Sequence, residues 1–345
     1  MELICDNIPV EYPNLLNYVL RHGDWVSPRN LRTLEVRGLS IVANNPLKRF
    51  FAHPSRNANP VFSIVELMWY LSGDDTSPMV SHYVSAVLNY LNPQTTRFDG
   101  AYGPRLRKYS KSVDQIEAIR RRLGQDKDTR RAVVTLFDPT IDNNEASINI
   151  PCQVLHQFLI RNDRLEMITY ARSQDMYKGF VYDTAEWQLF QDILAGWFGL
   201  GLGPYHLYIA SAHVYENDIT RVQRIVKSDT GFDLYKKSVP LSDSLSFQDW
   251  ERTRKLFYEV EDVTRNAQSP AAFEEALRMI ESIGPGFWKN AMVAIVSFNA
   301  FKRGETAYAT SVLSGITNEF RVLLSEWFSR KGGKRVSPNE HSALS

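Results

Sequence analysis

The stretch PCQVLHQFLIRNDRLEMITYARSQDMYKGFVYDTAEWQLF, residues 151 to 190, decides the fold and carries most of the candidate chemistry. Two runs rich in β-branched and aromatic residues, 153–160 and 164–171, are joined by the polar tripeptide Arg-Asn-Asp, which predicts a β-hairpin. From 184 to 198 large apolar side chains recur at helical spacing, and Gly199 ends the pattern. The sequence therefore predicts a hairpin followed by a helix that lies in the core.

The segments upstream of this stretch mix strands and helices. The alternating run 31–42 predicts one long strand or a strand pair, and 131–137 predicts a short apolar strand. Between them, 59–73 is a buried helix candidate that begins at a proline and stops at a glycine. The pattern at 112–123 indicates an amphipathic helix with a basic outer face.

Beyond about residue 241 the character changes to successive helical patterns with few strand signals, near 247–267, 270–283, 286–303 and 306–330. Mixed strands and helices followed by helices favour an α+β fold. We expect three parts: a mixed domain, a helical extension and a flexible polar tail, at residues 1–240, 241–330 and 331–345.

Composition excludes several classes of protein. The 345 residues are 43% hydrophobic, enough for a large core, and 40 basic against 39 acidic side chains give no overall field for direct nucleic-acid binding. The two cysteines, Cys5 and Cys152, make a disulfide framework implausible and suit a reducing compartment. The N-terminus lacks the pattern of a signal peptide, and no apolar run is long enough to span a membrane. We expect a protein of the cytoplasm, or of the host cytoplasm if viral, without a metal site.

Cys152 is the first candidate for chemistry. A cysteine after a proline, at the mouth of a strand, is either a small buried hydrophobe or a nucleophile. Arg172 follows the next strand, and a guanidinium beside a thiol favours the reactive thiolate. Arg130 and Arg131 precede another strand, where they would bind an anion or form a solvated pair at a helix end; spacing alone does not separate these.

Several motifs in order resemble thymidylate synthases and their nucleotide hydroxymethylase relatives over about residues 25 to 220. The matching landmarks are RNLRT (29 to 33), ELMWYLSGD (66 to 74), AYG (101 to 103), DTRRAVVTLF (128 to 137), PCQ (151 to 153), ARSQDMYKGFVYD (171 to 183) and HVY (213 to 215). The resemblance implies a mixed sheet with packed helices, to which the C-terminal helices would be an extension.

The resemblance also implies roles in the transfer of one carbon to a pyrimidine nucleoside monophosphate. Cys152 would add to C6 of the base and make C5 nucleophilic. Glu66 and Tyr102 would organise water and proton transfer around the ring. The cofactor would be 5,10-methylenetetrahydrofolate, with Asp175 and Gly179 beside it.

The remaining matched residues would hold the nucleotide's phosphate and sugar. A phosphate with nearly two negative charges needs several donors. Arg32 lies near enough to Arg29 to compete for its place in the alignment. The implied phosphate ligands are Arg29, Arg172 and Ser173, with Arg130 and Arg131 reaching across from the second subunit of a homodimer, and the implied sugar ligands are His213 and Tyr215.

One departure from the family concerns the base. Asp183 stands where thymidylate synthases carry an asparagine, which donates to uracil O4 and accepts from N3–H. Cytosine presents the opposite pattern, an amine donor and an N3 acceptor, and a carboxylate can accept from that amine. An ionised aspartate facing O4 would cost on the order of 1 to 3 kcal/mol. Relatives that hydroxymethylate deoxycytidylate carry aspartate here, so Asp183 indicates cytosine.

Other departures concern the second half of the reaction. Leu88 and Leu91 align with tryptophans that in the synthases help to shield the methylene intermediate, and the C-terminus SALS lacks their short apolar ending. Water would then add in place of hydride, giving a 5-hydroxymethyl product. Gln153 replaces a histidine and Ala171 a glutamine, which leaves both the deoxyribonucleotide and the ribonucleotide open.

The sequence thus predicts a pyrimidine nucleotide 5-hydroxymethyltransferase that converts dCMP, or CMP, through a covalent adduct of Cys152. A divergent thymidylate synthase that methylates dUMP is the alternative. A relative that only binds nucleotide or RNA is a third hypothesis, although a pure binder has no need of Cys152 beside Glu66 and Tyr102.

Overall fold

A mixed sheet forms the centre of the molecule. The computed structural model describes residues 2–110, 112–143, 149–228, 233–236, 240, 242–316 and 319–332. In these residues eight strands form one sheet in the order β1-β3-β8-β6-β5-β4, with β2 added beside β3 and β7 beside β8. The strands are β1 (Glu2–Cys5), β2 (Asp24–Val26), β3 (Thr33–Ala43), β4 (Val133–Thr135), β5 (Gln153–Arg161), β6 (Arg164–Ala171), β7 (Gln174–Asp175) and β8 (Gly201–Tyr215).

The predicted hairpin is confirmed as β5 and β6. These strands pair antiparallel from Gln153↔Ala171 to Arg161↔Arg164. The two turn residues, Asn162 and Asp163, have φ of 50° and 54°, the left-handed conformation that a tight two-residue hairpin turn requires and that Asn and Asp tolerate. Strand β6 then pairs parallel with β8, which places the hairpin in the interior of the sheet.

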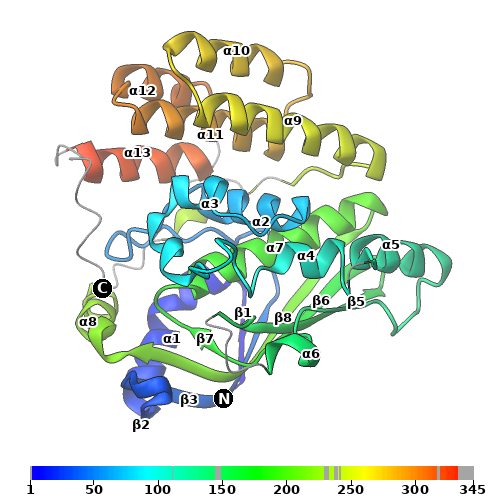
Figure 1. Ribbon diagram of the computed structural model, residues 1–345, viewed down its shortest axis with the longest axis vertical. Helices are drawn as coiled ribbons and strands as arrows, with labels where there is room; N and C mark the ends of the chain where they lie inside the picture. The colour runs from blue at the N-terminus through cyan, green and yellow to red at the C-terminus, as the bar shows by residue number, and fades with distance from the viewer. Residues whose placement is uncertain are drawn as a thin grey trace.

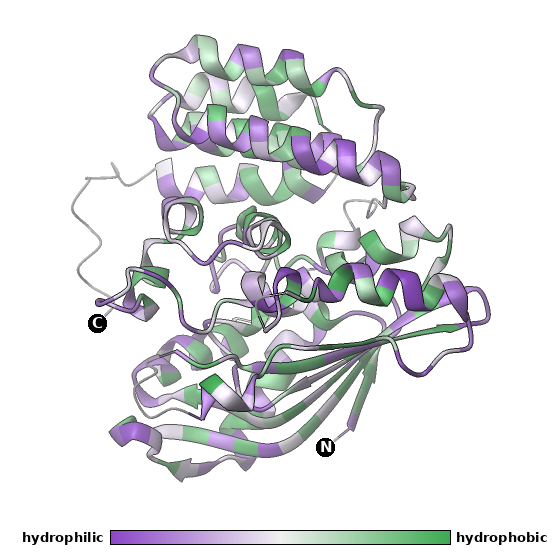
Figure 2. Ribbon diagram, turned by 45° about the vertical axis from the view of Figure 1, so that its right-hand side comes forward, coloured by the Kyte–Doolittle hydropathy of each residue, from purple (hydrophilic) through white to green (hydrophobic). Residues whose placement is uncertain are grey.

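Helices cover one face of the sheet. Figure 1 shows α2 and α7 lying above the strands, and Figure 2 shows the sheet with its other face free of helices. Helix α7 is buried along almost its whole length, as its apolar stripe predicts. The helices that precede the C-terminal extension are α1 (Ile8–His22), α2 (Phe62–Ser72), α3 (Pro78–Tyr83), α4 (Tyr102–Arg107), α5 (Gln115–Gln125), α6 (Pro139–Asp142), α7 (Phe180–Trp197) and α8 (Ile219–Lys227), with short 3-10 turns at Pro28–Asn30, Ser85–Tyr90, Glu216–Asp218 and Leu234–Lys236.

The C-terminal helices pack on the helical layer, away from the sheet (Figure 1). The Tyr258 hydroxyl donates to the Met68 carbonyl at 2.7 Å, and the Tyr83 hydroxyl donates to the Glu261 carboxylate at 3.1 Å. None of the described helices is long and apolar enough to cross a membrane. The extension comprises α9 (Phe247–Arg265), α10 (Pro270–Ile280), α11 (Phe287–Lys302), α12 (Thr306–Ser314) and α13 (Glu319–Gly332).

The end of the extension differs from the prediction. The pattern at 306–330 predicts one helix, but α12 ends at Ser314 and α13 begins at Glu319. Gly315 follows the first of these helices, and glycine costs a helix interior about 1 kcal/mol relative to alanine. Helix α13 continues through Gly332, and the rest of the predicted tail, residues 333–345, lies outside the described residues.

The two longest of the elements that the sequence did not predict are α1 and β8. Helix α1 contains Pro9 and Pro13, which hide its helical pattern, although Asn7 caps it by accepting from the Val10 amide. Strand β8 contains Pro204, a residue that argues against an interior strand. A register shift opposite this proline, between Leu165 and Met167 of β6, lets the strand continue.

Candidate active site

Cys152 lies immediately before β5, where the loop from α6 enters the sheet. Its carbonyl accepts from the Arg172 amide at 2.9 Å. The Arg172 guanidinium donates from Nε to the Pro151 carbonyl at 2.8 Å and from Nη2 to the Ile150 carbonyl at 2.9 Å. Arg172 therefore positions the cysteine loop as well as presenting positive charge beside it.

The thiol of Cys152 is more weakly acidic than the sequence predicts. Burial raises its pKa to about 11, and the carboxylates of Asp183 and Asp175 add to the increase. Arg172 and Arg29 lower the pKa, as expected, but by less. Because burial outweighs the two cations, the resting group is a thiol, and its ionisation must accompany the chemistry.

Tyr102 connects the helical layer to the cysteine loop. Its hydroxyl accepts from the Gln153 amide, the residue after Cys152, at 3.1 Å. The ring is buried and packs against Tyr70 and Trp187, with centroids 5.0 and 5.6 Å away. Its phenol is therefore held in place beside Cys152.

A chain of hydrogen bonds leads from Gln153 to Asp183. Gln174 Nε2 donates to Asp183 Oδ2 at 2.6 Å, and Gln153 Nε2 donates to Gln174 Oε1 at 2.9 Å. A carboxylate can only accept, so the direction of the whole chain follows from Asp183. It leaves Oε1 of Gln153 buried and without a hydrogen-bond partner in the described residues.

Gly179 and Glu66 flank Asp183. A Cβ on Gly179 would come within 3.2 Å of Asp183 Oδ2 and 3.4 Å of Gln174 Nε2, so a side chain there would press on this pair. Glu66, on α2, is half-buried, and burial raises its pKa, with Asp183 adding to the increase. Burial likewise raises the pKa of Asp183 to about 6.

The predicted sugar ligands, His213 and Tyr215, lie at the end of β8 next to β7. Strand β7 places Asp175 directly opposite His213 on β8. Ser173 Oγ is 3.5 Å from Nδ1 of His213, and the Tyr215 ring meets that of His213 edge-on at 5.2 Å. Asp175 Oδ1 accepts from the amides of residues 177 and 178, both at 2.9 Å.

The predicted arginines separate into two groups. Arg29 lowers the pKa of Cys152. Arg32, the other arginine that could match the same family position, forms a salt bridge with Glu216 at 3.2 Å. Arg29 adopts φ of 53° in a short turn. Arg130 and Arg131 are exposed and precede β4, and their own Cys152 lies at the opposite end of β5, seven residues beyond the position facing Arg131. At about 3.3 Å per residue the separation is about 20 Å, beyond the reach of an arginine side chain.

Several residues of the site were not predicted. Tyr90 is half exposed; burial raises its pKa, and the charges of Lys178, Asp175, Tyr215 and Cys152 also act on it, so its phenol lies within electrostatic range of these groups. It sits between the two leucines, of which Leu88 is exposed and Leu91 half-buried. Gln174 and Glu186 are fully buried polar residues that border Asp183 and Glu66, and their positions on β7 and α7 gave no separate signal.

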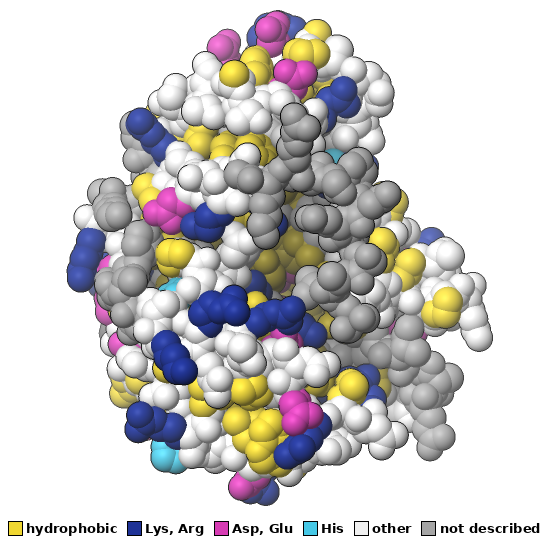
Figure 3. Space-filling model, turned by 90° about the vertical axis from the view of Figure 1, so that its left-hand side faces the viewer, with side chains coloured by type: hydrophobic (Ala, Val, Ile, Leu, Met, Phe, Trp, Pro, Cys, Tyr) yellow, Lys and Arg dark blue, Asp and Glu magenta, His cyan; other side chains and the backbone are white. Residues whose placement is uncertain are grey.

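Positive charge gathers locally although the net charge is only +1. Figure 3 shows lysine and arginine side chains beside a hollow on one face of the molecule. Of the described residues, no group of three His, Cys, Asp or Glu side chains is arranged to hold a metal ion.

Comparison with known proteins agrees with this arrangement. The sequence profile of the thymidylate synthase family matches residues 10–251. The chain belongs to the thymidylate synthase family. The match spans the sheet, α2 and α7, together with Cys152, and it ends within α9. The predicted family and α+β fold are therefore confirmed, and most of the helical extension lies beyond the matched region.

Individual relatives are similar at modest identity. A deoxyuridylate hydroxymethyltransferase of Bacillus phage SP01 is 28% identical over 242 residues, which are 67% of this chain and 63% of that protein. A protein of Methanococcoides burtonii named "Putative thymidylate synthase" is 32% identical over 61% of this chain and 88% of its own length. A deoxyuridylate hydroxymethyltransferase of Pseudomonas phage M6 is 30% identical over 53% of this chain and 52% of its own. The chain thus spans between half and two thirds of these phage relatives.

Proposed function

We propose that this member of the family transfers a hydroxymethyl group to C5 of a cytidine 5′-monophosphate, dCMP or CMP. The observation that carries the choice of base is the hydrogen-bond chain of Gln153, Gln174 and Asp183. Its direction leaves the Gln153 carbonyl oxygen without a donor and presents an acidic group beside it. A base that brings an amine supplies the missing donors, whereas uracil O4 would face another acceptor.

The residues around Cys152 support covalent catalysis. Cys152 Sγ adds to C6, its proton leaves to solvent or to a neighbouring base, and the electron pair moves through C5 to the exocyclic atom at C4. Arg172 and Arg29 stabilise the developing thiolate, and Tyr102 holds the loop that carries it. Glu66, whose pKa is raised by burial and by the charge of Asp183, is assigned the exchange of a proton with the ring or with its water. Elimination of Cys152 then restores the aromatic base.

The exposure of Leu88 and Tyr90 supports water as the reagent of the last step. Leu88 is 44% exposed where the synthases carry an indole ring, so this position provides little cover. Tyr90 lies within electrostatic range of Cys152 and Asp175 but is itself 50% exposed. Hydration of the exocyclic carbon gives the hydroxymethyl product, whereas hydride transfer requires a site from which water is excluded.

The residues present fit 5,10-methylenetetrahydrofolate as the carbon donor. Both backbone amides that reach Asp175 bond to Oδ1, and no described group bonds to Oδ2, which is free to accept from the N–H groups of a pterin. The exposed Tyr90 ring nearby offers a stacking surface. When bound, the cofactor supplies a one-carbon unit at the oxidation level of formaldehyde.

The proposal is tested by incubating the protein and methylenetetrahydrofolate with dCMP, CMP or dUMP separately. Mass spectrometry of the nucleotide and absorbance of dihydrofolate are then measured. A hydroxymethyl group gained by a cytosine nucleotide, without dihydrofolate, is the expected result and identifies the sugar. Methylated dUMP formed in step with dihydrofolate would overturn the proposal in favour of a thymidylate synthase.

A second candidate differs only in the base. Two of the compared phage proteins are named deoxyuridylate hydroxymethyltransferases, which favours dUMP as the substrate. A protonated Asp183 can donate to O4 and accept from N3–H, and its pKa of about 6 leaves a minor protonated fraction at neutral pH. In the same assay this candidate predicts hydroxymethylated dUMP without dihydrofolate, at a rate that rises as the pH falls toward 6.

A homodimer is part of the proposal. The face of the sheet without helices exposes Tyr170 and Tyr208, which lie side by side in the register of β6 and β8. Such an apolar face suits an interface between two copies. Arg130 and Arg131 lie about 20 Å from their own Cys152 along β5, and this distance supports the proposal that they serve a nucleotide in the other subunit.

Mixing two inactive variants tests this arrangement. Cys152→Ala loses the nucleophile, and the double variant Arg130→Ala, Arg131→Ala loses the donated charges. If the arginines act across the interface, unfolding and refolding the two variants together restores one intact site in each mixed dimer, roughly a quarter of all sites. No recovered activity, with dimers present in sizing experiments, would show that the arginines serve their own subunit.

A further inference from the structure

Glu186 is a buried carboxylic acid that the proposed mechanism does not use. It lies on α7 one turn after Asp183, and its side chain is fully buried. Glutamate is almost never fully buried unless it is paired. Helix α7 packs against α2 at this level, so the carboxyl group of Glu186 faces that of Glu66.

No cation in the described part of the chain pairs with Glu186. The charged groups that act on Glu186 are Glu66 and Asp183, both acidic, and the neutral group facing it is the phenol of Tyr70. The phenols of Tyr102 and Tyr205 respond to its charge from α4 and β8. Within the described residues neither oxygen of Glu186 has a hydrogen-bond partner of good geometry. Two buried carboxylates side by side are stable only if a proton lies between them.

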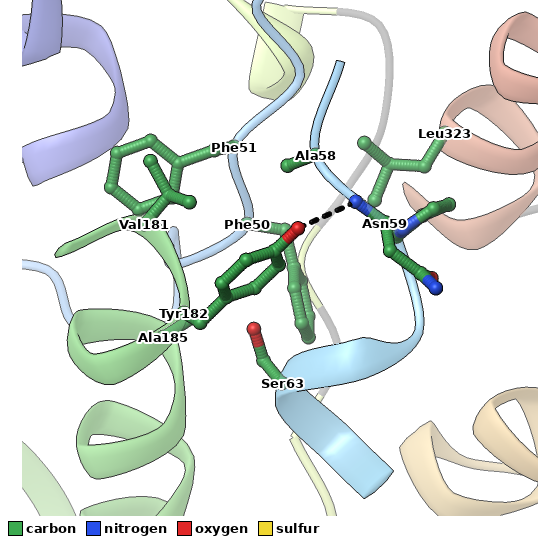
Figure 4. Close-up of a pocket in the computed structure, with 10 residues that line it drawn as sticks. Phe50, Phe51, Ala58, Asn59, Ser63, Val181, Tyr182, Ala185 and Leu323 are labelled. Carbon is green, nitrogen blue, oxygen red and sulfur yellow. Dashed lines mark hydrogen bonds between the residues drawn. The ribbon is translucent and has the colours of Figure 1, made fainter. Parts of the chain in front are cut away.

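Several contacts hold α2, which carries Glu66, against α7, which carries Glu186. At the start of α2 the Asn59 amide donates to the hydroxyl of Tyr182 on α7 at 3.0 Å (Figure 4). Leu323 of α13 lines the same pocket from the extension, as Ser63 of α2 does from below. On the far side of α2 the Tyr258 hydroxyl bonds to the Met68 carbonyl. Through Leu323 and Tyr258 the extension therefore packs on the helix pair that carries Glu66 and Glu186.

We propose that Glu186 is a positioning residue that stores a proton for Glu66. The inference rests on the proposed function, because Glu66 is the group that reaches the ring. At rest the pair holds one proton, which stays mainly on the more deeply buried Glu186. Burial, followed by repulsion from Glu66, raises the pKa of Glu186 well above that of an ordinary glutamate.

The proton moves and returns within one cycle. When Cys152 adds to C6, negative charge develops on the exocyclic atom at C4, and Glu66 delivers the shared proton to it, directly or through water. Both carboxylates are then ionised, a state that favours return of the proton when Cys152 is eliminated. No proton is consumed, and Glu186 never contacts the substrate.

Glu186→Gln tests the role with little change in shape. The amide removes the like charge and can donate to Glu66, so the pKa of Glu66 falls. We expect the alkaline limb of the kcat profile to move to lower pH by about one unit or more, with kcat at neutral pH falling about tenfold and KM nearly unchanged. Release of tritium from C5 of the nucleotide follows the covalent chemistry whichever product forms.

Two controls separate the possible failures. Glu261→Gln removes a carboxylate of similar burial in the extension and should leave the pH profile unchanged. Infrared spectra report protonated carboxyl groups without turnover, and the parent should lose such a band at neutral pH on Glu186→Gln. An unchanged profile and an unchanged band would overturn the role of Glu186. A parent that turns over none of the nucleotides would instead overturn the proposed function, while the infrared band still tests the shared proton.

Discussion

Two buried clusters of polar side chains, on opposite sides of α2, differ in how their charges are balanced. In the extension, Glu261 accepts from Arg265 Nε at 2.9 Å and from Tyr83 at 3.1 Å, and Asn299 donates to Tyr83 and to Thr264. Between α2 and α7, Glu66 and Glu186 lie near each other and near Asp183, and among the described residues no cation acts on them.

The difference separates structure from chemistry. A guanidinium and a phenol offset part of the desolvation cost of a buried carboxylate: burial raises the pKa of Glu261, and Arg265 and Tyr83 lower it again in part. Such a cluster fixes how helices pack. Buried carboxylates without a cation destabilise the fold. Such groups are found where their raised pKa values are needed for a reaction. Substitutions in the cluster between α2 and α7 should therefore change mainly the activity. Substitutions in the cluster of the extension should change mainly the stability.

The largest expected effect comes from Glu66→Gln, which keeps the shape of the side chain but removes its proton chemistry. We expect kcat to fall by about 10² to 10⁴-fold. The unfolding midpoint should stay the same or rise, because one of two repelling buried acids is gone. Glu261→Gln in the extension is the matched control, expected to lower the unfolding midpoint and leave kcat within about twofold. Equal losses of activity in both variants would remove the distinction between the clusters.

Much of the fold could be predicted because local signals agree with tertiary structure. The hairpin of β5 and β6, the buried helix α2 and the apolar stripe of α7 each have a periodic pattern bounded by turn residues. Helix α1 and strand β8 were missed because Pro9, Pro13 and Pro204 contradict their elements locally. An N-terminal cap and a bulge compensate for them, and neither can be seen in a linear pattern.

The candidate site could be predicted only in part. Of the residues named from the family landmarks, Tyr102 and Asp183 lie near the cysteine loop, whereas Arg130 and Arg131 lie at the opposite end of β5. Gln174 and Glu186 were missed because each is important through its partner on another element, Asp183 for one and Glu66 for the other. The effect of burial on Cys152 was also missed, since a sequence shows a neighbouring arginine but not the loss of water.

The extension should lose stability when its charge balance is broken. Arg265→Met keeps much of the apolar stem but leaves Glu261 with Tyr83 as its remaining partner. We expect a loss of about 3 kcal/mol in the free energy of unfolding, measured with denaturant. Activity of the folded fraction should be unchanged well below the unfolding midpoint. A free energy of unfolding of Arg265→Met within about 0.5 kcal/mol of the parent would mean that Arg265 does not stabilise the buried charge of Glu261.

Asp183→Asn should change the preference between bases. The Gln174 amide continues to donate to the side-chain oxygen of residue 183, so the new NH₂ group faces the base. The ratio of kcat/KM for the uracil nucleotide to that for the cytosine nucleotide should rise by about 10 to 100-fold. Gln188→Ala, which removes a buried amide elsewhere on α7, should leave the ratio unchanged. An unchanged ratio in Asp183→Asn would contradict base selection by Asp183.

The smallest expected effect is on how stability depends on pH. Burial raises the pKa of Asp183 from 3.8 to about 6 in the folded protein, so between these values the native state binds more protons than the unfolded chain. The stabilisation is fully present below about pH 3.8 and is lost as the pH rises through 6. Denaturant titrations at a series of pH values should therefore show the free energy of unfolding of the parent falling relative to that of Asp183→Asn. The full pKa shift corresponds to about 3 kcal/mol, and because Asp183 is only half-buried we expect about 1 to 2 kcal/mol. If the free energies of unfolding of the two proteins depend on pH in the same way, Asp183 is as well solvated as an ordinary surface acid. The difference in charge balance between the two clusters would then depend on Glu66 and Glu186 alone.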